Sequence, residues 1–502
     1  MKNKLRLNNI MSLIYQLISI IIGLIIPRLI LEYYGSTVNG YVYSISQMLS
    51  IITYFDFGVT AVAQAALYAP IVKNDSYQIS KIYYSVKRYF DKLSIFLLIY
   101  VIFLSIFYSF FQDNSFNWIY SLTLVIAISI SLFGQFIWGI SNQVLLAADQ
   151  KNYIYTILNI LTTILNGIIT YLLIINGFSV QAVKLVSSLI FICRPILLNF
   201  YVKKTYNLFS ITEVPKYVLP NRFSGIVQHI STTLISSLDT IVLTIFSNFS
   251  EVSVYNIYTF PLNGMRLIFE SVSSGYKGYF GHQLANDIVN KDIISEFRKF
   301  SFISGCFANI FLCVSMVSLP SFIKLYTAGI NDAAYSNPLF SIIIILSYYF
   351  MMIRIPYTTI INAAGHFKQT QHHNIIEILV NVIFSVFLVK KMGLTGVAIG
   401  TCLAVLYRIL ASIYYLTRNI INIPFLKEIK NQFTNFIIVM IFYFVSNIIK
   451  FNMETGIMWV LGSLGYTVLC IIIIILVNII FNRNIFLVSS LLGEKNDKDF
   501  FR

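Results

Sequence analysis

The chain has 502 residues, of which 57% are hydrophobic and 11% are charged, and its mean hydropathy is +0.77. An average soluble protein is about 25% charged, so this composition excludes a soluble globular protein. Lysine and arginine outnumber aspartate and glutamate by 35 to 20, which gives a net charge of +15. In a membrane protein such an excess commonly records topology, so it gives no reason to expect a nucleic-acid partner.

Apolar stretches that are long enough to cross a bilayer follow one another along nearly the whole chain. A spanning helix needs about 20 mainly apolar residues. Polar, proline or glycine residues separate fourteen such stretches, which are 10-31, 40-69, 93-112, 117-147, 152-175, 179-200, 223-247, 254-283, 299-323, 336-364, 371-390, 394-416, 433-449 and 456-481. The sequence therefore predicts an all-α, polytopic membrane protein with about 14 transmembrane helices.

The basic residues orient these spans. With the N-terminus inside, the loops assigned to the outside contain only Lys324, Lys390, Lys391 and Lys450, and the other loop lysines and arginines fall inside. The opposite orientation would reverse the positive-inside bias. We therefore expect both termini to be cytoplasmic, and we expect residues 71-92 to form an inside loop with room for an interfacial helix.

The first six spans and the next six show a weak internal repeat. A shift of 214 residues aligns Asp56 with Glu270 and Arg194 with Arg408, and a shift of 216 aligns Gly177 with Gly393. Six spans return the chain to the same side, so duplicated halves would be related by an axis along the membrane normal.

The repeat predicts three segments. They are an N-terminal six-helix half at 1-215, a C-terminal six-helix half at 216-425, and two additional helices with a cytoplasmic tail at 426-502. A cavity between the two halves is the expected place for a substrate.

Ionisable residues inside the spans are the strongest functional candidates. A charge at the bilayer centre costs roughly 3 kcal/mol, so such residues usually face a cavity or a partner. The candidates are Arg28, Asp56, Arg194, Asp239, Arg266, Glu270, Arg354 and Arg408. Spacing of four residues allows Arg266 to pair with Glu270 and Arg28 to pair with Glu32. Asp239 is a candidate to neutralise a deep arginine, and Arg194 and Arg408 are expected to be structural.

Deep arginines predict the charge of the substrate. Arginine stays charged at any attainable pH and its planar fork binds phosphate oxygens in pairs, so these residues favour an anionic substrate. Arg354 is followed by Pro356, which is expected to bend the helix beside it. The five histidines and five cysteines lack metal-ligand spacing, and no ATP-binding motif of the GxxxxGK[ST] type is present, so we expect no cofactor.

One stretch resembles a known family. The residues IIPRLILEYYGSTVNGYVYSISQMLSIITYFDFGVTAVAQAALYAPIVKND, from Ile25 to Asp75, are similar to the opening of polysaccharide transporter family flippases. These share a superfamily with multidrug and toxin extrusion antiporters and the lipid II flippase. The acidic residue usual in span one of drug antiporters is absent from 10-31, so the chain resembles capsule or O-antigen repeat-unit flippases more closely.

The resemblance implies that the protein moves a polyprenyl-diphosphate-linked oligosaccharide across the inner (plasma) membrane of a bacterium by alternating access. In that role Arg28, Arg266 and Arg354 would pair with the diphosphate. Asp56, Asp239 and Glu270 are the groups able to couple transport to an ion gradient. Membrane lipids, a polysaccharide polymerase and glycosyltransferases are the implied partners.

Two other functions remain open from the sequence. A cation-coupled multidrug antiporter is disfavoured because the deep charge is more cationic than anionic. A membrane glycosyltransferase or polymerase is disfavoured because the outer loops are short and contain only scattered carboxylates. We therefore expect a transporter rather than an enzyme.

Overall fold

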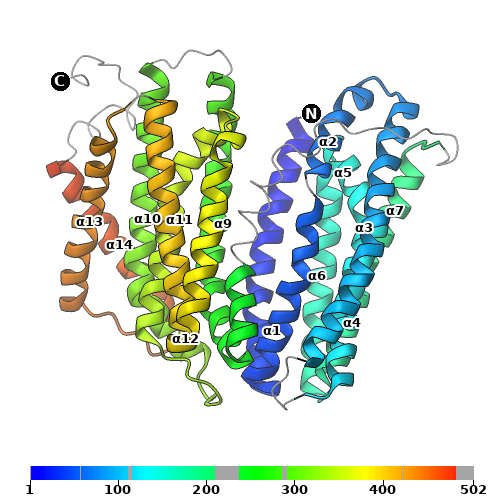
Figure 1. The fold of residues 1–502 in the computed structure, drawn as a ribbon, viewed down its shortest axis with the longest axis horizontal. Coiled ribbons are helices and arrows are strands. Elements are labelled where there is room, and N and C mark those ends of the chain that lie inside the picture. Colours follow the sequence, from blue (N-terminus) through cyan, green and yellow to red (C-terminus); the bar gives the residue numbers. More distant parts are fainter. Residues whose placement is uncertain are drawn as a thin grey trace. The chain divides into compact units, whose positions relative to one another are not determined.

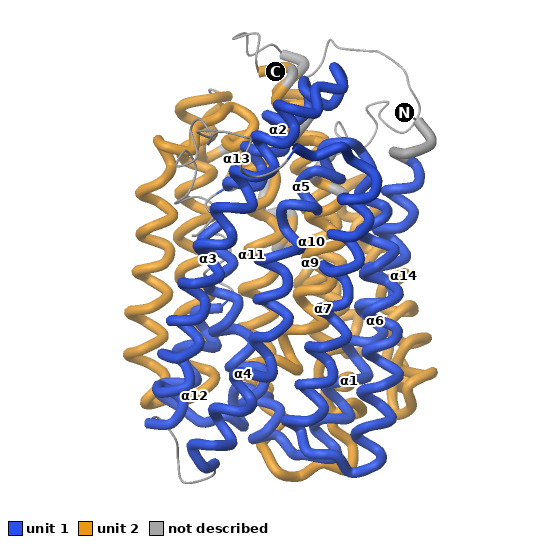
Figure 2. The backbone as a smooth tube through the Cα atoms, turned by 90° about the vertical axis from the view of Figure 1, so that its right-hand side faces the viewer, with its two compact units in different colours: residues 1–253 blue, residues 254–502 orange. Residues whose placement is uncertain are grey.

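The computed structural model of the chain describes residues 2–56, 58–110, 116–209, 237–284, 291–421 and 423–481, and in these ranges the regular structure is entirely helical. Contacts divide the chain into two compact units, unit 1 from Met1 to Ser253 and unit 2 from Val254 to Arg502 (Figure 2). The predicted segments 1-215, 216-425 and 426-502 stay a prediction. Each unit is described by itself below.

Unit 1 is built largely of long helices (Figure 1). Its elements are α1 (Lys2–Ser50), the 3-10 helix η1 (Ile51–Asp56), α2 (Val59–Val72), α3 (Ser76–Phe110), α4 (Trp118–Gly134), the π-helical turn η2 (Gln135–Gly139), α5 (Ile140–Ala148), α6 (Asn152–Ile175), α7 (Val180–Thr205) and the helix Ser237–Phe246. The first residues of α9 (Phe249–Leu284) also belong to this unit.

Unit 2 continues α9 and adds five further helices. They are α10 (Lys291–Tyr326), α11 (Pro338–Ala363), α12 (Phe367–Asn419), α13 (Phe425–Ile448) and α14 (Gly456–Phe481). A small apolar core of residues such as Cys313, Phe442 and Cys470 holds α13 and α14 against α10.

Two of the continuous helices are pairs of spans joined at a glycine. Gly35 in α1 has φ 83° and Gly393 in α12 has φ 53°, a left-handed conformation that residues with a Cβ rarely adopt. Without the break, the apolar run Arg6–Asp56 would be about 75 Å long at 1.5 Å per residue, more than twice the bilayer core. The chain therefore ends one span and starts the next at these glycines.

The predicted spans and the observed helices agree. Each predicted span lies on helical segments of the described residues. The second extends over the end of α1, η1 and α2, the fourth extends over α4, η2 and α5, and the seventh can be followed only from residue 237, because 223-236 lie outside the described ranges. Eight helices of the described part are by themselves long and apolar enough to cross a membrane. The expected all-α, polytopic membrane fold is confirmed.

The structure differs from the prediction that residues 71-92 form a loop outside the third span. These residues do not form a separate loop or interfacial helix, because α3 begins at Ser76 and runs without a break to Phe110. Ile79, Ile82 and Val86 recur every three or four residues and are buried, which gives this segment a packed face of its own.

Candidate functional site

A buried cluster of three charged residues lies between α11 and α12 of unit 2. The Nη1 atom of Arg354 lies 2.5 Å from Oε1 of Glu377, and the Nε atom of Arg408 lies 3.5 Å from Oε2 of the same carboxylate. One carboxylate thus bridges two guanidinium groups. Because two positive charges share one negative charge, the cluster retains a net charge of +1 inside the membrane-spanning helices.

Arg354 is the member of this cluster that a ligand can reach. Its side chain is 16% exposed, against 3% for Glu377 and 4% for Arg408. Among the described residues the side chain of Arg354 is bonded only through Nη1, so Nε and Nη2 remain available as donors. A guanidinium with two free donors can bind two oxygens of a phosphate at once.

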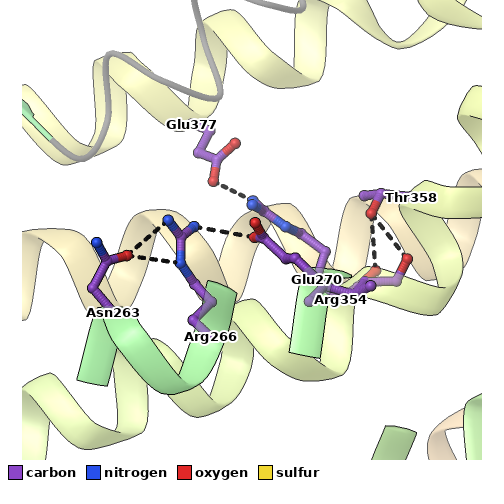
Figure 3. A network of polar contacts seen from close by, with 7 residues as sticks. Asn263, Arg266, Glu270, Arg354, Thr358 and Glu377 are labelled. Atoms are coloured by element: carbon purple, nitrogen blue, oxygen red, sulfur yellow. Dashed lines mark hydrogen bonds and ion pairs between the residues drawn. The ribbon is translucent and has the colours of Figure 1, made fainter. Parts of the chain in front are cut away.

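A second ion pair lies on α9 of the same unit. The expected pairing of Arg266 with Glu270 is confirmed, with Nη1 of the arginine 3.4 Å from the carboxylate. The Nε and Nη2 atoms of Arg266 both donate to Oδ1 of Asn263, at 3.3 and 3.0 Å. Figure 3 shows Arg266 held between Asn263 and Glu270, whereas Arg354 points toward Glu377. All three nitrogens of Arg266 are therefore engaged already.

Aromatic contacts fix α9 on its neighbours. Phe269 stacks on Phe307 of α10 with ring centroids 4.9 Å apart, and Tyr258 meets Phe340 of α11 at 4.9 Å. Phe269 lies between Arg266 and Glu270 in the sequence, so its buried ring sets the rotation of this part of the helix. The two charged side chains then lie beside the packed face, with 20% and 43% of their surfaces exposed.

In unit 1, Arg28 and Asp56 both have local partners. Arg28 lies 3.8 Å from Glu32 one turn further along α1, which confirms the expected pair. Asp56 ends η1 and accepts hydrogen bonds from the backbone N–H and the hydroxyl of Thr60, at 3.1 and 2.5 Å. The carboxylate of Asp56 therefore caps the first turn of α2.

The second span is discontinuous at this point. It changes from α-helix to 3-10 helix at Ile51, and Gly58 adopts φ 71° before α2 begins. Tyrosines of α3 bind carbonyls near the break, Tyr100 to Met48 at 2.8 Å and Tyr89 to Phe55 at 2.5 Å. Interrupted helices of this kind recur at the binding sites of transporters.

Asp239 is almost completely buried in the helix Ser237–Phe246 and lies in unit 1. Arg266 and Arg354, which the sequence suggested as its partners, belong to unit 2. The role of Asp239 in neutralising either arginine stays a prediction. Within the described ranges no group of three or more histidine, cysteine or acidic side chains is arranged to hold a metal ion.

Contacts between equivalent residues support the internal repeat. In unit 1 Ser187 donates to Asn166 at 2.6 Å, and in unit 2 Asn381 donates to Thr401 at 3.0 Å. The members of these pairs are 214 or 215 positions apart in the two halves. Gly177 and Gly393 also both have positive φ between the fifth and sixth spans of their halves.

The charged cluster corresponds to a group with a single charge in unit 1. Arg194, the repeat equivalent of Arg408, donates to the hydroxyl of Thr162 at 3.3 Å, and Thr162 corresponds to Glu377 at a shift of 215. At a shift of 216, Arg354 corresponds to Trp138. Unit 2 therefore has an arginine and a glutamate where unit 1 has a tryptophan and a threonine.

The fourth span is distorted at the same place in both halves. In unit 1 the π-helical turn η2 ends at Gly139, and Asn142 donates to the carbonyl of Trp138 at 2.5 Å. In unit 2 Pro356 interrupts the backbone hydrogen bonding of α11, and Thr358 donates to the carbonyl of Arg354 at 3.3 Å. A polar side chain four residues later thus binds the carbonyl of Trp138 and of Arg354 alike.

The sequence analysis missed Glu377, although a signal was present. Buried polar residues recur every three or four positions along the first half of α12, at Thr370, Asn374, Glu377, Asn381 and Ser385. The fifth span of unit 1 has a similar buried stripe that includes Asn159, Thr162, Asn166 and Thr170. Aligning the two stripes would have singled out Glu377 as a carboxylate at a position where the first half has Thr162, whereas its contact with Arg408 required the packing of the helices.

The solved structures with a similar fold include a membrane flippase and multidrug transporters. A structure of the lipid II flippase MurJ in an inward closed conformation has a TM-score of 0.65 and 17% sequence identity, and it covers 96% of this chain and 99% of that chain. An inward-facing multidrug resistance MATE family transporter of the MOP superfamily has a TM-score of 0.57 and 14% identity, with 80% and 94% of the chains covered.

A third such structure, the MATE multidrug transporter DinF-BH in complex with R6G, has a TM-score of 0.55 and 15% identity, and covers 84% of this chain and 97% of that chain. No protein-family model and no curated protein matches the sequence. The chain is a multi-pass membrane protein with the fold of the MurJ flippase and the MATE transporters.

Proposed function

We propose that this protein is a flippase that moves a polyprenyl-diphosphate-linked oligosaccharide repeat unit from the cytoplasmic to the outer leaflet of a bacterial inner membrane. It would serve the synthesis of a capsule, an O-antigen or an exopolysaccharide, and both termini would be cytoplasmic. The fold supports a transporter, and the likeness to a lipid II flippase supports a lipid-linked substrate. A polymerase and glycosyltransferases would act on the same lipid carrier.

The observation that carries this proposal is the state of Arg354. It is a partly exposed arginine in a membrane-spanning helix. Its Nη1 atom donates to Glu377, and its Nε and Nη2 atoms are available to a ligand. A permanently charged group is costly in a bilayer unless a ligand or a partner uses it. A diphosphate supplies several oxygens in the geometry that a guanidinium binds in pairs.

Arg28 of unit 1 and Arg266 of unit 2 are the other two arginines that we assign to the diphosphate. Each is paired with a carboxylate one turn away, at 3.8 and 3.4 Å, so each pair has little net charge. We assign them a supporting role in guiding the diphosphate, with Arg354 as the principal contact. Coupling to an ion gradient is assigned to Asp56, Asp239 and Glu270, of which Asp239 is almost completely buried and Glu270 has a side chain that is 43% exposed.

The second candidate is a cation-coupled multidrug antiporter, because the MATE transporters share the fold. The excess positive charge of the cluster around Arg354 would repel a cationic drug. The carboxylates of Glu270 and Glu377 are already paired with arginines. The anionic substrate is therefore the better match. The membrane glycosyltransferase or polymerase has no support from the neighbouring structures, which are flippases and transporters.

The first test replaces Arg354 in cells that depend on this protein for surface polysaccharide. Arg354→Ala is expected to abolish surface polysaccharide while the amount of protein in the membrane stays close to wild type, and Arg266→Ala is expected to lower it. Both are measured by immunoblotting of polysaccharide and of the tagged protein. Lys391→Ala is the matched control, because Lys391 is an exposed basic residue outside the site. Normal polysaccharide in the Arg354→Ala strain would refute the assignment.

A further inference from the structure

We propose that Glu377 is an internal competitor of the substrate for Arg354, so that the anionic group of the lipid binds by displacing the Glu377 carboxylate. This inference rests on the proposed function and adds a residue that neither the sequence motifs nor the fold assigns. The two oxygens of Glu377 contact different arginines, Oε1 contacting Arg354 and Oε2 contacting Arg408. The carboxylate can therefore leave Arg354 without losing all of its counter-charge.

The burial of the three side chains favours loss of the contact between Glu377 and Arg354 over loss of its contact with Arg408. Arg408 and Glu377 are 4% and 3% exposed, so their contact is shielded, whereas the contact with Arg354 lies at the accessible edge of the cluster, where the arginine is 16% exposed. An incoming phosphate would reach Arg354 first, from the side of its free Nε and Nη2 donors. Glu377 would then remain on Arg408, and the net charge of +1 would be neutralised by the ligand.

The other half of the molecule shows which part of the cluster the scaffold needs. At a shift of 214 residues Arg194 of unit 1 corresponds to Arg408, and among the described residues it donates to the hydroxyl of Thr162 and not to a carboxylate. The equivalent of Arg354 there is Trp138, which has no charge to balance. The scaffold thus tolerates the arginine of the sixth span alone, and Glu377 occurs together with Arg354.

The competition has a functional consequence. A bare arginine in this position would hold a diphosphate tightly and release it slowly, which would stop transport after binding. A carboxylate that returns to Arg354 lowers the affinity for the ligand and promotes its release. Removing the carboxylate should therefore raise affinity and lower the rate of flipping, a combination that loss of structure does not produce.

The test measures binding of farnesyl diphosphate, with farnesol as the neutral control, to the purified full-length protein in detergent by calorimetry. Wild type should bind the diphosphate more tightly than the alcohol. Glu377→Gln should bind the diphosphate about tenfold more tightly than wild type, because one charge-assisted contact no longer competes. Arg354→Gln should lose the preference for the diphosphate.

Glu377→Asp provides a second variant that keeps the charge balance of the cluster and so protects folding. Its carboxylate is one methylene shorter, so its contact with Arg354, which is 2.5 Å long in the wild type, should weaken, and the variant should also bind farnesyl diphosphate more tightly than wild type. Unchanged or weaker binding by the folded Glu377 variants, with normal binding by wild type, overturns the competition and leaves the proposed function standing. Absence of a diphosphate preference in wild type and in every variant overturns both.

Discussion

The properties of Arg354 depend on which of its own nitrogen atoms are already bonded. Arg266 and Arg354 are both deep arginines beside a carboxylate, yet Arg266 uses its three nitrogens on Asn263 and Glu270, whereas Arg354 uses one on Glu377. The number of remaining donors, and not the presence of a charge, separates a residue suited to bind phosphate from one that is internally satisfied.

At the same scale, the residues of unit 1 supply a matched replacement for the charged pair of unit 2. Glu377→Thr alone leaves Arg354 and Arg408 without a counter-charge, and breaking a buried ion pair in this way costs about 3–5 kcal/mol. The double variant Arg354→Trp with Glu377→Thr reproduces the unit 1 residues Trp138 and Thr162. Its melting temperature in detergent is expected to lie near that of wild type, well above that of the single variant, while transport is lost.

The single variant provides the internal comparison for that measurement, since both proteins lack the same carboxylate. A double variant that melts as low as Glu377→Thr would show that the two halves do not share this packing arrangement. A double variant that is stable and still transports would show that the charged pair has no part in function.

At the scale of elements, the fifth and sixth spans of the two halves are built alike. The pair Asn166 and Ser187 matches the pair Asn381 and Thr401, and Thr162 with Arg194 matches Glu377 with Arg408. A hydroxyl in one half is thus replaced by a carboxylate in the other at the same helix contact. The contact tolerates either partner because both accept hydrogen bonds from the arginine.

This equivalence predicts the effect of adding a carboxylate to unit 1. Thr162→Glu should be tolerated, with a melting temperature at or above that of wild type, because Arg194 lies 3.3 Å from the hydroxyl that is replaced. Thr162→Val, which has nearly the same shape but no acceptor, leaves the arginine without that bond and should cost about 1–3 kcal/mol. Thermal unfolding of the two purified variants checks this, and a lower melting temperature for Thr162→Glu than for Thr162→Val would contradict it.

The sequence predicts the helices well, but it predicts the contacts between residues of different helices poorly. Hydropathy places the spans of the described residues on helices, because a bilayer requires a minimum apolar length whatever the tertiary packing. The same criterion started the third span too late, since residues 76-92 of α3 are amphipathic and hydropathy does not detect them. Pairs four residues apart, such as Arg266 with Glu270, follow from helix geometry. The contact of Arg354 with Glu377 joins two helices and requires their packing to be known.

At the scale of the whole molecule, the fold narrows the function without deciding the substrate. MurJ and the MATE transporters share this architecture, and one fold can serve different substrates. The difference must come from a few side chains within the spans. In this chain the interrupted second span and the cluster around Arg354 are the features that a membrane scaffold alone does not require.

The coupling residues are tested in sealed vesicles that contain the purified protein and an imposed ion gradient. A proton or sodium gradient is expected to accelerate flipping of a lipid-linked oligosaccharide by wild type, and Glu270→Gln should reduce this acceleration because the carboxylate that is 43% exposed can no longer exchange an ion. Asn263→Ala, which alters the other partner of Arg266, is the control for loss of local structure. If neither a proton nor a sodium gradient changes the flipping rate of the wild type, coupling through these residues is ruled out.

The most direct measurement is the flipping rate itself, in vesicles loaded with a fluorescent polyprenyl-diphosphate oligosaccharide and without any gradient. The lipid that reaches the outer leaflet is detected by a quencher that does not cross the membrane. Wild type is expected to move this lipid across the membrane and not to transport a cationic dye. Arg354→Ala should reduce flipping to the level of vesicles without protein. Equal flipping by wild type and Arg354→Ala, or transport of the dye in place of the lipid, would contradict the account.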